Sequence, residues 1–190
     1  MVCASILSSV QNNRHLGCEH AVRTLQNSKF LEKVRVPIHW KEVVEETTSG
    51  RHFEALAGVT QTCKQLAAHT RKAVENKEEL LVIGGDHSCA MGTWSGVASA
   101  IRPCGELGLI WVDAHMNLTS LGDTLSKVLP HNMCMVGIRS YEKGEQELLE
   151  RLGVRIFYME EVDRRGIADV MQEAQYLVTR LEHIWIRNVY

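Results

Sequence analysis

Two short apolar runs constrain the fold of this 190-residue chain more than any other feature of its sequence. One lies in residues 79–85, where Leu-Leu-Val-Ile precedes two glycines, and the other lies in residues 107–114. A strand that is apolar on both faces must be covered on both sides, which is typical of central strands in parallel sheets. We therefore expect the strand from Leu80 and the strand from Leu107 to be neighbouring central strands of one sheet.

Helical and strand-like patterns alternate along the chain after residue 50. This alternation predicts an α/β fold with a parallel sheet, because each helix returns the chain to the start of the next strand. The expected strands are residues 79–85, 107–114, 132–139, 154–159 and 184–186. The expected helices are residues 51–77, 87–101, 142–152 and 161–182. Before residue 50 the pattern is less regular, with a helix expected over residues 18–33 and a strand over residues 34–40.

The composition excludes several classes of protein. With 45% apolar and 23% charged residues, the chain is neither disordered nor collagen-like. A net charge of −2 gives no reason to expect nucleic acid as a partner. No apolar run approaches the roughly 20 residues that a membrane helix needs. Six cysteines without a CxxC pair indicate a reducing compartment, so we expect a cytoplasmic location, with the mitochondrion as the alternative.

Polar residues follow the two apolar runs, where ligands gather in an open parallel sheet. Asp113 and His115 are two positions apart, so in extended backbone both side chains face the same side. His87 follows the other run. A carboxylate with imidazoles suits a first-row divalent ion such as Mn²⁺, although spacing alone also fits purely structural residues. Gly84 and Gly85 fit a tight turn, and no phosphate-binding glycine motif is present.

Longer strings around these residues carry a resemblance to a known family. The segments LLVIGGDHSCAMGTWSGV and GLIWVDAHM, followed by MCMVGIRSYEKGEQELLERLGVRIFYMEEVDRRGIADVMQEA, resemble the ureohydrolase family, and arginase in particular. The upstream stretch LGCEHAVRTLQNSKFLEKV is similar as well. The resemblance implies a three-layer α/β/α fold with a mainly parallel sheet. It implies a single domain over residues 1–190 that is incomplete at its C-terminal side.

The resemblance also implies a metal site. By position, His87, Asp113 and His115 match manganese ligands, and Asp113 would bridge two Mn²⁺ ions. Asn117 stands where the family has a further aspartate. An amide oxygen can coordinate a hard cation but brings no negative charge.

The reaction that the resemblance implies is manganese-dependent hydrolysis of L-arginine to ornithine and urea, as in the urea cycle and arginine catabolism. Two Mn²⁺ ions lower the pKa of a bridging water, and the resulting hydroxide attacks the guanidinium carbon. Glu142 and Glu145 match acidic positions of the family's substrate pocket, which hold the cationic substrate.

Further departures from the family bear on activity. The family's Gly-Asn-x-His-Gly segment is absent, and the chain ends in HIWIRNVY where the family continues into DxDxxDP. Two Mn²⁺ ions carry four positive charges, and of four family carboxylates only Asp113 is matched. We therefore expect at most one weakly held ion and little or no hydrolysis. The chain resembles an arginase with an internal deletion and a truncated C-terminus, as a splice variant or a fragment.

Other interpretations of the same residues stay open at this point. One is a non-catalytic arginase-like isoform or fragment that binds partners. Another is an agmatinase-type ureohydrolase, and a more distant one is a zinc deacetylase-like site on a related fold. A homo-oligomer, as in the family, is a further expectation.

Overall fold

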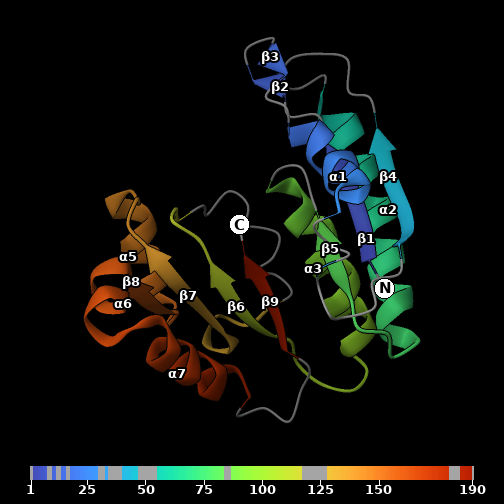
Figure 1. Ribbon diagram of the computed structural model, residues 1–190. Coiled ribbons are helices and arrows are strands. Elements are labelled where there is room, and N and C mark those ends of the chain that lie inside the picture. The colour runs from blue at the N-terminus through green and yellow to red at the C-terminus, as the bar shows by residue number, and fades with distance from the viewer. Residues whose placement is uncertain are drawn as a thin grey trace. The chain divides into compact units, whose positions relative to one another are not determined.

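The computed structural model describes residues 2–7, 10–11, 14–15, 18–29, 33, 40–46, 55–83, 87–116, 128–179 and 185–189. Its contacts divide the chain into two compact units, Met1–Ala100 and Ile101–Tyr190. Each unit combines a parallel sheet with helices (Figure 1). The prediction of an α/β fold with a mainly parallel sheet is therefore confirmed, and the prediction of one domain stays a prediction.

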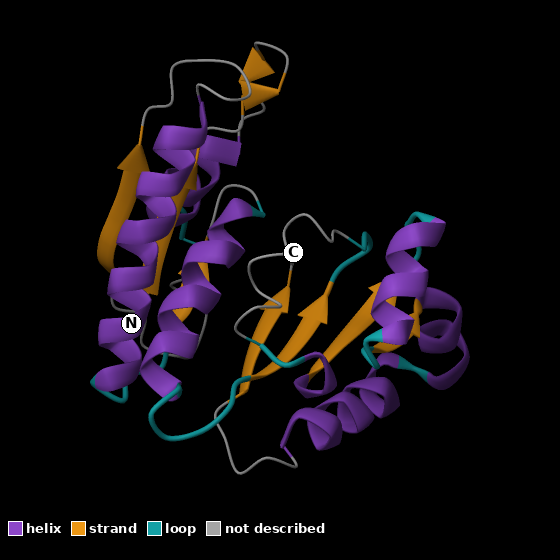
Figure 2. Ribbon diagram, turned by 180° about the vertical axis from the view of Figure 1, so that it is seen from behind, coloured by secondary structure: helices purple, strands orange, loops and turns teal. Residues whose placement is uncertain are grey.

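The first unit contains a three-stranded parallel sheet in the order β4-β1-β5. Its strands are β1 (Val2–Leu7), β4 (Trp40–Glu46) and β5 (Leu81–Ile83). Helix α1 (Cys18–Asn27) covers one face of the sheet, and α2 (Ala55–Glu75) and α3 (Ser88–Ile101) lie on the other, as opposite views show (Figures 1 and 2). A short antiparallel pair, β2 (Val10–Gln11) and β3 (Arg14–His15), follows β1.

Helix α3 is apolar around most of its circumference, and only Ser99 along its length is exposed. A helix of this kind must be packed on several sides. Two glycines let it approach α2 closely. A Cβ atom at Gly92 would lie 2.7 Å from the carbonyl oxygen of Cys63, and one at Gly96 would collide with Thr70 Oγ1 and the carbonyl oxygen of Ala67.

The second unit contains a four-stranded parallel sheet in the order β8-β7-β6-β9. Its strands are β6 (Gly108–Val112), β7 (Met133–Ile138), β8 (Arg155–Tyr158) and β9 (Trp185–Val189). Its helices are η3 (Pro130–Asn132, a 3₁₀ turn), α5 (Lys143–Arg151), α6 (Met159–Arg165) and α7 (Ile167–Thr179). Helices α6 and α7 cover one face of the sheet over an apolar core of Ile110, Cys134, Val136, Phe157, Val162, Val170, Ala174 and Val178.

Most expected elements are present within one to four residues of their expected ends. The expected helix over residues 161–182 is wrong in one respect, because Gly166 at φ 85° separates α6 from α7. Strand β1, central in its sheet, was not among the expected elements. Residues 34–39 of the expected strand over residues 34–40 lie outside the described residues.

The order of strands corrects a second expectation. Strand β6 is central, as predicted, but it hydrogen-bonds β7 on one side and β9 on the other. Strand β5 pairs with β1 among the described strands. The expected pairing of the strand from Leu80 with the strand from Leu107 is therefore wrong, because β9, distant in sequence, holds that side of β6. The expected central position of the strand from Leu80 is also wrong within the described strands, since β5 is the last strand of its sheet and Leu81 is 47% exposed.

An ion-pair network joins β8 to α6 and α7. Arg155 contacts Glu161 at 2.7 Å and Glu173 at 3.4 Å. Arg165 contacts Glu161, Asp169 and Glu173, each at 2.7 Å. The hydrogen bonds from Arg155 and then Arg165 hold the pKa of Glu161 below its ordinary value of 4.5. Within the described residues, no helix is long and apolar enough to cross a membrane.

The close approach of α2 and α3 predicts that Gly96→Ala lowers the free energy of unfolding by about 1–3 kcal/mol or more. The added methyl group has no room against the carbonyl of Ala67. Gly144→Ala is the matched control, because Gly144 is also helical and a Cβ there meets nothing within 4 Å. The control should leave stability unchanged or raise it by up to about 1 kcal/mol. Equal effects of the two changes in denaturant unfolding would contradict this packing.

The network around Glu161 predicts a pH dependence. A carboxylate whose pKa is lowered by folding stabilises the fold above its unfolded pKa, and this contribution is lost as the pH falls through its folded pKa. Glu161→Gln should therefore flatten the loss of stability below about pH 4.5. Glu147→Gln, which removes a 3.6 Å pair on an exposed helix face, should keep the parent's pH dependence. Unfolding curves measured between pH 3 and 7 check both outcomes.

Candidate functional site

The carboxyl end of β6 holds Asp113 in a fixed orientation. Alternation along the strand places Trp111 and Asp113 on the same face. The indole Nε1 of Trp111 donates a hydrogen bond to Asp113 Oδ2 at 3.2 Å, and the backbone amide of Asp113 donates to the carbonyl of Val136 at 3.1 Å. Asp113 is 6% exposed, so its carboxylate is buried and depends on such donors.

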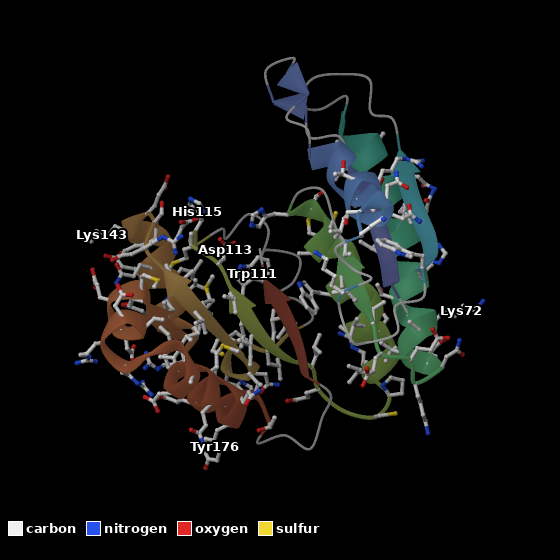
Figure 3. The ribbon with its side chains drawn as sticks, in the orientation of Figure 1. Lys72, Trp111, Asp113, His115, Lys143 and Tyr176 are labelled. Atoms are coloured by element: carbon white, nitrogen blue, oxygen red, sulfur yellow. The ribbon has the colours of Figure 1, made fainter. Side chains whose placement is uncertain are left out.

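His115 completes the arrangement from the same short segment (Figure 3). Its backbone amide donates to Asp113 Oδ1 at 3.0 Å, and its imidazole Nδ1 lies 3.7 Å from the same oxygen. The imidazole side chain is 61% exposed. The structure thus places a buried carboxylate beside an accessible ring nitrogen, across a bend at Ala114, whereas the prediction assumed extended backbone there.

His87 lies between β5 and α3, and its carbonyl accepts a hydrogen bond from the amide of Ala90 at 3.0 Å. It is thus at the carboxyl end of its own strand, as expected. It belongs to the first unit, whereas Asp113 and His115 belong to the second. The convergence of all three side chains stays a prediction. Asn117 and residues 84–86 lie outside the described residues.

The donor atoms at this edge are of the types that bind a divalent metal ion, but there are few of them among the described residues. Oxygen and imidazole nitrogen donors match the chemistry of Mn²⁺. The described ranges, however, contain no group of three or more His, Cys, Asp or Glu side chains that could hold an ion. Asp113 and His115 together supply two donor side chains. Burial raises the pKa of Cys134 to about 12, so this thiol stays protonated at neutral pH.

Glu142 and Glu145 have a local role at the start of α5. Glu142 is the N-cap residue, and its carboxylate accepts the backbone N–H of Glu145. In return, the backbone amide of Glu142 donates to Glu145 Oε2 at 3.2 Å. This reciprocal pair is a capping box, which satisfies amides that the helix leaves without partners. The substrate-binding role implied for both residues stays a prediction.

Sequence reasoning missed Trp111 as part of this site. A tryptophan in an apolar strand is ordinarily a core residue, and Trp111 is indeed fully buried. The signal was its position two residues before Asp113, on the same face of the strand.

Comparisons with known proteins identify the family and the fold of this chain. The sequence model of the Arginase family matches residues 5–186. The arginase of Bacillus caldovelox is 31% identical over 177 residues, which are 78% of this chain and 58% of that protein. A crystal structure of arginase from Bacillus subtilis matches with a TM-score of 0.79 at 25% identity, over 98% of this chain and 70% of that one.

A more distant structure shares the fold. It is a formiminoglutamase variant from Trypanosoma cruzi with Mn²⁺, at 14% identity and a TM-score of 0.72, over 93% of this chain and 65% of that one. The present chain spans little more than half the length of the curated Bacillus caldovelox relative.

The indole hydrogen bond to Asp113 predicts that Trp111→Phe costs more stability than Trp94→Phe. Both tryptophans are fully buried, but Trp94 Nε1 has no hydrogen-bond partner among the described residues. Both changes remove similar apolar volume, and only Trp111→Phe also removes a donor to a carboxylate, which is worth about 1.5–3 kcal/mol. Denaturant unfolding measures the difference. Equal losses in the two variants would show that the indole does not hold Asp113.

Proposed function

Because the chain belongs to the arginase family, we propose that it carries part of a manganese-dependent ureohydrolase site and hydrolyses L-arginine far more slowly than its longer relatives. The observation that carries this proposal is the buried Asp113 carboxylate, oriented by Trp111 and by the amide of His115 at the end of β6. Hydrolysis of arginine would yield ornithine and urea.

Each residue of this segment has a defined task in the proposal. Trp111 and the His115 amide keep the Asp113 oxygens in one orientation, so that the carboxylate meets a cation without reorganising. The exposed imidazole of His115 supplies a nitrogen donor at the same edge. A bound manganese ion would supply Lewis-acid activation of water there.

The low rate follows from charge. Asn117, where the family has aspartate, offers a neutral oxygen. The described residues bring together Asp113 and His115 and no third ligand of the searched types. A divalent ion beside one buried carboxylate keeps uncompensated positive charge, which disfavours its retention in a partly desolvated place. The chain would hold at most one ion, weakly.

Glu142 and Glu145 support substrate binding by charge. Both carboxylates lie at the start of α5, Glu142 exposed and Glu145 half-buried, in the segment that follows β7. Their capping hydrogen bonds fix the positions of both side chains. A guanidinium group would be attracted to such a pair.

Urea release from arginine with added Mn²⁺ tests the proposal. We expect the 190-residue chain to turn over arginine at least about 100-fold more slowly than the Bacillus caldovelox arginase. Asp113→Ala should abolish the remaining rate, whereas Asp163→Ala, on an exposed position of α6, should not change it. Asn117→Asp should raise the rate while leaving it well below that of the relative, because one added carboxylate does not supply a second ion's ligands.

Turnover near the rate of the relative, abolished by Asp113→Ala, would contradict the proposed low rate. Urea release from agmatine but not from arginine would contradict the proposed substrate. A residual arginine rate that Asp113→Ala leaves unchanged would contradict the proposed site.

A further inference from the structure

Strand β7 contains one extra residue close to the candidate site. Its pairing with β8 joins Val136 to Phe157 and then Ile138 to Tyr158, so Gly137 has no counterpart on β8. Gly137 also has a φ of 88°, a conformation that L side chains rarely adopt. An extra residue in this conformation is a β-bulge, which redirects the strand that carries it.

The bulge changes the register on the other side of β7 as well. Val112, the last residue of β6, pairs with Val136. An unbroken register would then place His115 opposite Arg139, but His115 forms its parallel bridge with Ser140. A shift of one residue reverses the face on which paired side chains lie. The bulge therefore shifts the register of His115, whereas the amide of Asp113 still donates to Val136 in the unshifted register.

The shifted register is fixed by backbone hydrogen bonds. The amides of Arg139 and Ser140 both donate to the carbonyl of Ala114, at 2.9 and 3.0 Å. The amide of Met116 donates to the carbonyl of Ser140 at 3.0 Å. These bonds hold both sides of His115, whose own amide reaches Asp113 Oδ1.

Arg139 supports the bulge from outside. Its guanidinium Nη1 donates to the carbonyl of Gly137 at 3.2 Å and lies 3.9 Å from the Met159 sulfur. The side chain is exposed, so its removal leaves the core intact.

We propose that Gly137 is a positioning residue, whose bulge sets the register that brings the amide and imidazole of His115 to the Asp113 carboxylate, and that Arg139 stabilises the bulge. The geometric part of the proposal stands on the hydrogen bonds of this segment. Its consequence for metal binding rests on the proposed function.

A matched pair of variants separates the bulge from general backbone strain. Gly137→Ala places a Cβ at φ 88°, 3.4 Å from the carbonyl oxygen of Asp113. Gly153→Ala imposes similar strain at φ 77°, with nothing within 4 Å. Both variants should lose stability through strain, and only the first should disturb the Asp113 segment.

The test follows the Trp111 indole N–H resonance and the hydrogen exchange of the Met116 and Ser140 amides by NMR. In Gly137→Ala we expect the indole resonance to shift and exchange at both amides to accelerate at least about tenfold relative to amides of β7. In Gly153→Ala these signals should match the parent. An unchanged indole and unchanged exchange in Gly137→Ala, or the same changes in Gly153→Ala, would overturn the proposal.

Arg139→Met keeps the test decisive if Gly137→Ala does not fold. It removes the donor to the Gly137 carbonyl and should accelerate exchange at the same amides, and Arg139→Lys should restore part of the protection. Exchange as slow in Arg139→Met as in the parent would overturn the role of Arg139. Binding of Mn²⁺ to the parent protein is measured separately by titration. Failure to bind Mn²⁺ would count against the proposed function, whereas the indole and amide signals decide the role of the bulge.

Discussion

The parallel pairing of β6 with β7 is the interaction on which the second unit depends. On β6, Leu109, Ile110 and Trp111 are completely buried between the layers that cover the sheet, and burial of each large apolar side chain contributes about 1.5–3 kcal/mol. The same pairing continues past the end of β6, through the amide of Asp113 and the carbonyl of Val136. Packing energy from the core thus fixes the direction in which the polar segment leaves the sheet.

Much of this fold could be predicted from local pattern. Strand β6 is apolar on both faces and is central, because only a covered position satisfies such a strand. The predictions that failed concern contacts between distant parts of the chain. Strand β9, far along the chain, is the neighbour of β6, and no local pattern specifies which strand takes that side. Strand β1 was missed for a related reason, since its place between β4 and β5 is set by pairing. The break at Gly166 was missed because apolar periodicity continues on both sides of it.

In the candidate site, too, the features that depend on local geometry could be predicted and those that depend on strand register could not. The two-residue spacing of Asp113 and His115 was enough to predict that they lie close together, because such spacing is local geometry. Their actual arrangement also depends on the bend at Ala114 and on the shifted register of His115. The bulge at Gly137 could not be predicted, since a bulge is defined only against the register of its neighbours. Glu142 and Glu145 show a third case. The spacing that matches a family substrate pocket is also that of a capping box, and one pair of carboxylates can meet both descriptions.

Our central proposal is that this chain orients one buried carboxylate for a metal ion and does not retain a pair of ions, since the described residues contain no group of three or more ligands. The most direct measurement is the stoichiometry of Mn²⁺ on the purified 190-residue protein, by equilibrium dialysis with metal analysis and electron paramagnetic resonance. We predict no more than one ion per chain, removed by dialysis against buffer and absent in Asp113→Ala. Two ions per chain that survive dialysis, with the spectrum of a coupled pair, would contradict the claim.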